Sequence, residues 1–419
     1  MVDCSFNVWR GLMRSHVLAT AALFLCCSSV SFATEFSFHP SLAVSEEYTD
    51  NVLERSTDKK SDFITRVLPG ISLLYKAPRW DWDGRYTFDY RYYAKRNRSD
   101  EITHDAAVKG QIRVVDEFFF VDLDEIYKKV SLDVTRDNTG ESLFFNQSDR
   151  NTFTVSPYFV WRLNPKAKLK TGYRYMNTWY KEPTGVDRTD HSGFGELAYE
   201  ITPRTTFTAG YTFTHQDSSL NDYDKHDGYV GGRYEFDERS YLFGQVGYTS
   251  IRYDFGQNVG NVFWNAGFSK TFDSLTAHVN TGVKYTEDPQ SNLTKETFYS
   301  GGLDYLFGRG EASLFLNYSD FDRIGPGTID TTRYTAGVRA RYELVPSLTG
   351  SAGFEADNFV RSYMLNTPRR YFATASLSYL LSEGFTLTAT YIYVDYYSPT
   401  VVGDNREINR AILELRKIF

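Results

Sequence analysis

Residues 80–95 read WDWDGRYTFDYRYYAK, so aromatic and charged side chains alternate along this stretch. One parity holds Trp80, Trp82, Tyr86, Phe88, Tyr90 and Tyr92, and the other holds Asp81, Asp83, Arg85, Thr87, Asp89, Arg91 and Lys95. Successive side chains of a β-strand point to opposite faces, whereas a helix would mix the two sets on each face. The stretch therefore predicts a strand with one aromatic face and one charged face.

The same alternation recurs from residue 36 to residue 419, and two kinds of break interrupt it in turn. Nine breaks are tight and lie at residues 77–79, 116–117, 164–165, 202–204, 237–239, 273–274, 308–309, 345–346 and 382–384. The others are longer and polar, as at residues 49–62, 137–148, 181–188, 217–225, 288–294, 320–330 and 398–405. Short turns at one rim and long loops at the other are typical of an up-and-down transmembrane β-barrel.

The number of breaks sets the number of strands. Nine tight turns and ten longer connections predict an all-β, antiparallel barrel of about 20 strands, with a range of about 18 to 22. Each unit of roughly 19 residues holds a spanning strand of about 9 to 11 residues with its share of turn and loop. One segment, Phe119–Val134, changes parity near Asp124 and Glu125, which indicates a bulge or a miscounted turn.

The composition agrees with a β-rich chain. The 419 residues include 32 Tyr, 32 Phe and 6 Trp but only 12 Pro and 4 Met. Aromatic side chains fit a pleated surface, and Trp or Tyr near strand ends form the aromatic girdles of membrane barrels. Trp80, Trp82, Trp161, Trp179 and Trp264 are the candidates for such girdles.

The N-terminus has the parts of a cleavable signal peptide. Arg10 and Arg14 precede an apolar core, residues 17–30, and Ser31-Phe32-Ala33 is a small-x-small cleavage site. We expect a signal peptide at residues 1–33 and an outer-membrane barrel at residues 34–419. Met13 is an alternative start to Met1.

All three cysteines, Cys4, Cys26 and Cys27, precede the expected cleavage site. A mature chain without cysteine excludes disulfides, zinc–thiolate sites and thiol nucleophiles.

The last strand resembles the signal that the outer-membrane insertion machinery recognises. Leu413, Leu415 and Phe419 share one parity, and Arg410, Glu414 and Arg416 occupy the other. With an even number of strands, both termini are expected on the periplasmic side.

Catalysis, cofactors and nucleic acid are not expected. The histidines are scattered without metal-ligand spacing, and the net charge of −7 disfavours nucleic acid as a partner. The neighbouring carboxylates Asp122, Asp124 and Glu125, like Asp81 with Asp83, are more simply explained as solvated charges of a lumen or rim.

A barrel of this size without a plug domain before its first strand would enclose an aqueous channel. On the predicted parity, the inward face carries sixteen cations and twelve carboxylates. Eleven of the cations are the candidate selectivity residues: Arg85, Arg91, Lys109, Arg113, Lys168, Lys170, Arg174, Arg233, Arg339, Arg341 and Arg416. Rings of Arg and Lys favour anions, although opposite charges on neighbouring strands can simply pair.

One loop is oddly apolar. Residues 137–148 contain Leu143-Phe144-Phe145, which predicts either a constriction folded into the lumen or a loop tip that touches lipid headgroups or a partner.

The start of the expected mature chain resembles the putative β-barrel porin type 2 family, particularly its exopolysaccharide-associated and PEP-CTERM-associated members. The similar residues are FHPSLAVSEEYTDNV at residues 38–52 and LPGISL at residues 68–73. The resemblance implies a barrel connected with polysaccharide synthesis and export, and it transfers no catalytic residues.

Three functions remain open. The first is a channel for export or passage of an extracellular, anionic polysaccharide, and the second is a general porin for small solutes. The third is a structural sleeve around a partner such as a multihaem cytochrome, since the chain has no haem-binding CxxCH of its own.

Overall fold

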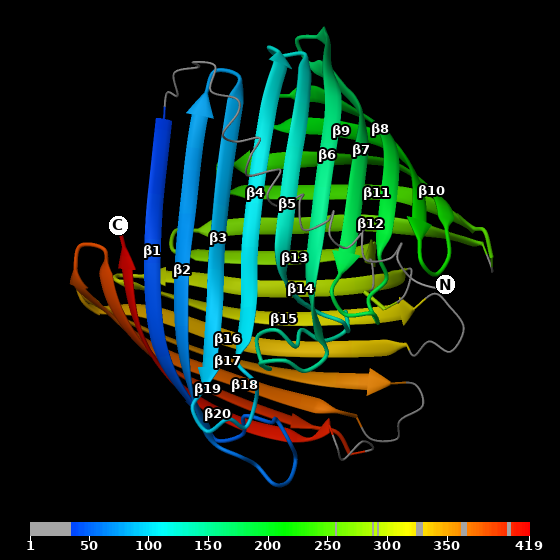
Figure 1. The fold of residues 1–419 in the computed structure, drawn as a ribbon. Coiled ribbons are helices and arrows are strands. Elements are labelled where there is room, and N and C mark those ends of the chain that lie inside the picture. Colours follow the sequence, from blue (N-terminus) through cyan, green and yellow to red (C-terminus); the bar gives the residue numbers. More distant parts are fainter. Residues whose placement is uncertain are drawn as a thin grey trace, which may run out of the picture.

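The computed structural model describes residues 35–255, 258–286, 289–290, 293–323, 330–361, 367–399 and 404–419. Within these residues the chain forms twenty antiparallel strands in sequence order (Figure 1). They are β1 (Glu35–Thr49), β2 (Asp62–Ala77), β3 (Trp80–Tyr93), β4 (Glu101–Val115), β5 (Phe119–Ser131), β6 (Gln147–Asn164), β7 (Ala167–Tyr180), β8 (Arg188–Thr202), β9 (Thr205–Ser218), β10 (Tyr223–Asp237), β11 (Ser240–Tyr253), β12 (Val259–Phe272), β13 (Leu275–Thr286), β14 (Thr294–Phe307), β15 (Gly310–Arg323), β16 (Thr331–Val345), β17 (Leu348–Arg361), β18 (Arg369–Ser382), β19 (Phe385–Tyr397) and β20 (Arg406–Ile418).

The sheet closes on itself. Each strand pairs with its neighbours along the chain, and β20 pairs with β1 from Ser41↔Ile418 to Thr49↔Arg410. Closure removes the free edges that an open sheet would present in lipid. The near strands cross the far strands at a large angle in Figure 1, as the tilt of a barrel requires. The predicted class, strand number and nine tight turns are confirmed.

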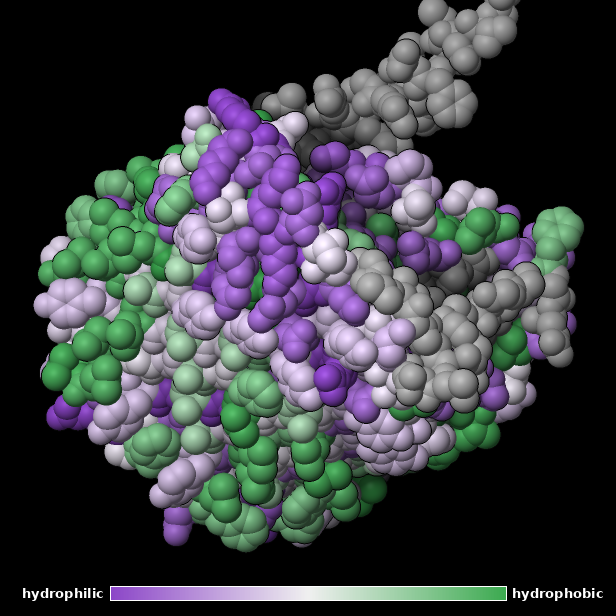
Figure 2. Space-filling view, turned by 90° about the horizontal axis from the view of Figure 1, so that it is seen from below, coloured by the Kyte–Doolittle hydropathy of each residue, from purple (hydrophilic) through white to green (hydrophobic). Residues whose placement is uncertain are grey.

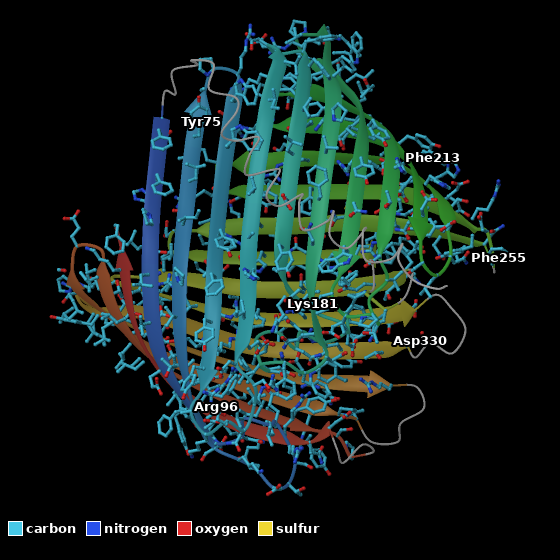
Figure 3. The ribbon with its side chains drawn as sticks, viewed as in Figure 1. Tyr75, Arg96, Lys181, Phe213, Phe255 and Asp330 are labelled. Atoms are coloured by element: carbon cyan, nitrogen blue, oxygen red, sulfur yellow. The ribbon has the colours of Figure 1, made fainter. Side chains whose placement is uncertain are left out.

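The tight turns lie at one end of the barrel, here named the tight-turn end, and the longer connections lie at the other, named the loop end. Figure 3 labels one residue near each end of the barrel. Tyr75, close to the last residue of β2, lies near the tight-turn end, and Arg96, just after β3, lies at the loop end.

The two faces of the sheet have the chemistry that alternation predicted. One parity contributes most of the exposed large hydrophobic side chains, for example Tyr211, Val246 and Leu316, and faces outward. The other parity carries the ion pairs and faces the lumen. Figure 2 shows hydrophilic side chains gathered over the middle of one end and hydrophobic ones on the flanks. Within the described ranges, no helix has the length and apolar character needed to cross a membrane.

The predicted irregularity in β5 is wrong. The strand runs without a bulge, and Asp124 and Glu125 pair in continuous register with Thr154 and Phe153 of β6. The alternation fails because Glu125 occupies an outward position, opposite Val108 of β4 and Phe153. Glu125 is therefore not a lumen charge, whereas Asp122 and Asp124 lie on the inward parity. The predicted signal peptide, its cleavage site, both candidate start positions and the three cysteines lie outside the described residues.

Candidate functional site

The connection between β5 and β6, residues 132–146, folds into the lumen at the loop end. Its Leu143 side chain is 7% exposed and belongs to a buried apolar cluster with Val52 of the β1–β2 connection. The cluster is completed by Ile64 of β2 and Tyr93 of β3, which are fully buried and paired on the inward face. Of the two predictions for the apolar loop, the one that places it inside the lumen is therefore confirmed, and the constriction stays a prediction. We name residues 132–146 the infolded loop.

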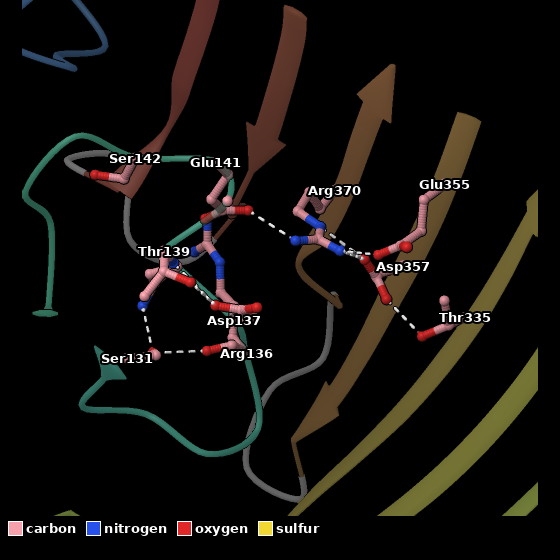
Figure 4. A network of polar contacts seen from close by, with 12 residues as sticks. Ser131, Arg136, Asp137, Thr139, Glu141, Ser142, Thr335, Glu355, Asp357 and Arg370 are labelled. Atoms are coloured by element: carbon pink, nitrogen blue, oxygen red, sulfur yellow. Dashed lines mark hydrogen bonds and ion pairs between the residues drawn. The ribbon is translucent and has the colours of Figure 1, made fainter. Parts of the chain in front are cut away.

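Glu141 attaches the infolded loop to β18, a strand that is not adjacent to β5 or β6 in the barrel (Figure 4). Its Oε2 lies 3.1 Å from Nη1 of Arg370 on β18, and its other oxygen pairs with Arg136 of the same loop. The side chains of Glu141 and Arg370 are only 1% and 6% exposed. On β20, Nη2 of Arg410 donates hydrogen bonds to the carbonyl oxygens of Gly140 and Glu141, at 3.2 and 3.3 Å. The loop is therefore held through both side-chain and backbone atoms.

Carboxylates of the wall orient Arg370. Its Nε donates to Asp357 of β17 at 2.7 Å, and its Nη2 pairs with Glu355 on the same strand. Asp357 also accepts hydrogen bonds from Arg333 at 2.8 Å and from the Thr335 hydroxyl at 2.6 Å. Burying these charges is tolerable only because each has a partner. The wall thus presents a fixed guanidinium to the loop.

A second arginine of β20 completes the attachment. Nη1 of Arg406 lies 3.6 Å from Oε2 of Glu54, and its guanidinium carbon lies 3.8 Å from the centre of the Phe145 ring. A cation over an aromatic face adds attraction where water is excluded. We name Arg370, Arg406 and Arg410 the arginine clasp.

Glu54 joins two loops. The carboxylate of this residue in the β1–β2 connection accepts hydrogen bonds from the Ser142 hydroxyl at 2.5 Å and from the Leu143 backbone N–H at 2.6 Å. Burial raises the pKa of Glu54 above its ordinary value, although the hydrogen bonds and the nearby arginines oppose the rise. The carboxyl therefore binds its proton more tightly when the loops are docked than when they are apart.

A separate group of ion pairs lies on the inward face of β2, β3 and β4. Arg66 of β2 and Arg91 of β3 both contact Asp89, at 2.7 and 2.9 Å, and Arg91 lies 3.7 Å from Glu101. The Arg91 side chain is only 12% exposed. Its charge is thus neutralised within the wall.

All eleven candidate selectivity cations lie on the inward parity of their strands. Six have a carboxylate within 4.0 Å: Arg85, Arg91, Arg113, Arg233, Arg339 and Arg416. Among the described residues, no carboxylate lies that close to the other five: Lys109, Lys168, Lys170, Arg174 and Arg341. Lys170 and Arg174 instead lie near the Phe194 ring, at 5.7 and 5.4 Å from its centre. The lumen therefore contains both neutralised and unneutralised cations.

The sequence did not single out Arg370, Arg406, Glu54 or Glu141. Arg370 continues the alternation of β18 one residue beyond its recognised start at Tyr371, and Arg406 directly follows a predicted loop. If the alternation of β18 and β20 had been followed back to the first residue of each strand, Arg370 and Arg406 would have been predicted to face the lumen. No local signal marks the two glutamates, because their partners come from distant strands.

The candidate insertion signal lies on the outer face of the last strand. Leu413 and Leu415 are 54% and 43% exposed, and Phe419, just after β20, is 65% exposed. The Phe419 backbone N–H donates to the Pro40 carbonyl at 2.9 Å. The last strand thus has exposed apolar side chains where recognition by the insertion machinery was expected.

Within the described ranges, no group of three or more His, Cys, Asp or Glu residues has the arrangement to hold a metal ion.

Comparisons with known proteins agree with the fold. No family model matches the chain, and no curated protein sequence matches it, so the resemblance to the porin type 2 family stays a prediction. Among solved structures, the FrpB iron transporter from Neisseria meningitidis has a TM-score of 0.53 at 10% identity, covering 92% of this chain and 82% of that one. The ferric-catecholate import receptor Fiu from E. coli K12 has a TM-score of 0.52 at 10% identity, covering 93% and 82%. The siderophore receptor PirA from Pseudomonas aeruginosa reaches 0.50 at 10% identity, covering 91% and 80%. At such low identity these likenesses establish the fold alone, which is that of an outer-membrane β-barrel.

Proposed function

We propose that this protein is an outer-membrane channel for anionic, hydroxyl-rich solutes, with an extracellular polysaccharide as the leading candidate. In this proposal the loop end is extracellular, both termini are periplasmic, and a signal peptide at residues 1–33 directs export. The observation that carries it is the infolded loop, which the arginine clasp holds across the lumen. A wide barrel narrowed at one level by an anchored loop discriminates among solutes by size and charge.

The charge of the wall supports preference for anions. Five of the eleven candidate selectivity cations have no carboxylate within 4.0 Å among the described residues, and we expect local positive potential around these five side chains. Such potential inside a low-dielectric wall concentrates anions. The resemblance of residues 38–52 and 68–73 to exopolysaccharide-associated barrels points to the same solute class.

A general porin is the second candidate. Six of the eleven cations have carboxylate partners, so a large part of the wall is locally neutral and would select weakly. The sleeve hypothesis fits less well, because the infolded loop and the β1–β2 connection occupy space at the loop end that a folded partner would need.

Proteoliposome swelling tests the proposal with three sugars of one size: galacturonate, glucose and glucosamine. We expect the swelling rate to fall in that order. Equal rates would favour the general porin, and no swelling with any of the three would contradict a channel.

A further inference from the structure

Four aromatic rings line the lumen on alternate strands. They are Phe194 of β8, Tyr229 of β10, Phe263 of β12 and Phe298 of β14, and we name them the ring row. Each lies directly opposite an inward glycine of the preceding strand: Gly172 of β7, Gly210 of β9, Gly247 of β11 and Gly282 of β13. One pattern thus repeats four times across eight of the twenty strands, β7 to β14.

Each ring covers its glycine. A Cβ placed on any of the four glycines would come within 2.9 Å of a ring carbon of its partner. The rings are half-buried, because one face covers the glycine backbone while the lumen adjoins the other. Neighbouring members are two strand spacings apart, roughly 10 Å. The wall therefore offers a succession of flat aromatic surfaces along its circumference.

Much of the wall between the rings is neutral and polar, whereas the Tyr229 hydroxyl donates a hydrogen bond to Glu196 at 2.6 Å. The inward parities of β9, β11 and β12, which are described throughout, contain no charged residue. Beside the rings lie paired neutral side chains, Gln245 opposite Asn265 and Asn280 opposite Ser300. Amides and hydroxyls both donate and accept hydrogen bonds, so this wall suits a solute that is rich in hydroxyl groups.

Cations mark both ends of the row. The Arg174 guanidinium lies 5.4 Å from the centre of the Phe194 ring. Nζ of Lys284 lies 5.1 Å from the centre of the Phe298 ring but also 3.0 Å from Oε2 of Glu296, so its charge is neutralised. An acidic group on a solute that contacts the Phe194 ring would meet the charge of Arg174, which has no carboxylate within 4.0 Å among the described residues.

We propose that the ring row is a binding track for the sugar rings of an acidic glycan chain. One face of a pyranose ring presents mainly C–H groups and stacks on an aromatic ring, while the hydroxyls at its edge bind amides and hydroxyls. A small inorganic anion would not use the rings, and an apolar solute would not use the amides. The inference rests on the proposed channel function and adds to it the substrate class and the residues that bind it.

Aromatic rings over glycines also stabilise sheets, so the test separates binding from folding. Phe263→Leu and Phe298→Leu keep an apolar side chain over the glycine but remove the flat face. Phe268→Leu is the matched control, because Phe268 lies on the outward face of the same β12, opposite Leu242. Heat-modifiable migration on gels confirms that each barrel is folded.

Binding of a galacturonate hexamer to the refolded protein in detergent is measured by calorimetry, with maltohexaose and a polyethylene glycol of similar length for comparison. We expect the hexamer to bind more tightly than maltohexaose, and the polyethylene glycol not to bind. Each lumen substitution should weaken binding about two- to tenfold, and Phe268→Leu should leave it unchanged.

Unchanged affinity in both lumen variants, an equal loss in Phe268→Leu, or no binding of either glycan to the unaltered protein would overturn the proposal. Calorimetry needs no conduction. The ring row can therefore fail while swelling shows a functional channel, and the channel can fail while glycan binding persists.

Discussion

Arg370 of β18 and Glu141 of the infolded loop form a buried ion pair with a nitrogen–oxygen distance of 3.1 Å, although 229 positions separate them in the chain. The pair connects the β5–β6 connection to β18, which lies seven strands from β5 around the closed sheet, and fixes the loop inside the lumen. Removing the Glu141 carboxylate takes one partner from Arg370, which keeps Asp357 and Glu355, and leaves the buried Arg136 without a carboxylate within 4.0 Å among the described residues.

We therefore expect Glu141→Gln to undock the infolded loop. The loss should weaken docking by about 3–5 kcal/mol, the usual cost of breaking a buried ion pair from one side. Single-channel recordings should show a larger conductance or frequent transitions to a larger open state. Glu182→Gln, in the exposed β7–β8 connection, is the control and should behave like the unaltered protein. Identical conductance in both variants would show that the loop does not limit the pore.

The apolar anchor of the loop offers an independent test. Leu143→Ala leaves a cavity against Ile64 and Tyr93, at a cost of about 2–5 kcal/mol to docking. Limited proteolysis of intact cells or proteoliposomes should then cleave the infolded loop faster. Leu220→Ala changes a leucine that is 60% exposed, and cleavage there should stay at its original rate. A loop that remains resistant after Leu143→Ala would mean that the arginine clasp alone holds it.

Docking of the loop should also depend on pH through Glu54. Because burial raises the pKa of this carboxyl in the docked state, its contribution to docking is fully present below the ordinary pKa and is lost as the pH rises through the raised pKa. The window extends upward from the ordinary Glu value of about 4.3. Hydrogen exchange of the Leu143 amide, corrected for intrinsic rates, should show more protection at the acidic side of this window. In Glu54→Gln that dependence should vanish, and a dependence that persists would assign it to another group.

Arg341 tests charge selectivity directly. It lies on the inward parity of β16, without a carboxylate within 4.0 Å among the described residues. Arg341→Ala should shift the reversal potential under a salt gradient toward that of a cation-permeable pore. Arg252→Ala removes a cation from the outward parity of β11 and should cause no shift. A null effect of Arg341→Ala would remove this residue from the selectivity set.

The end of the chain should govern assembly rather than stability. Phe419→Ser removes an exposed ring whose role we expect to be recognition by the insertion machinery, so the amount of folded barrel in the outer membrane should fall severalfold. Refolding of the purified variant into detergent should proceed as for the unaltered protein, because Phe419 is 65% exposed and lies beyond β20. An equal loss of folded barrel in cells and in detergent would instead indicate that Phe419 stabilises the folded barrel.

The strands and turns could be predicted from the sequence because alternation is a local property. The residues of each strand alone indicate which of its faces is apolar. The prediction was wrong at β5, where an outward Glu125 broke the pattern without any change in the backbone. The apolar Leu143-Phe144-Phe145 marked the loop that folds inward, but its partners come from β18, β20 and the β1–β2 connection. Those contacts form only because the closed barrel brings distant strands together. The residue pattern of a single strand does not predict which distant strands these are.

The ring row shows a similar limit. Phe263 alternates correctly within β12, yet its position over Gly247 depends on the register between two strands. A register shift of one residue would turn the ring to the other face. Periodicity therefore predicts the inward side chains, and only the pairing reveals which of them act together.

The most direct test is the reversal potential of single channels formed by the refolded protein in planar bilayers under a salt gradient. The proposed function predicts an anion-selective potential and a conductance that a galacturonate hexamer reduces. A cation-selective potential, or a barrel that stays silent even when Glu141→Gln has released the infolded loop, would contradict it.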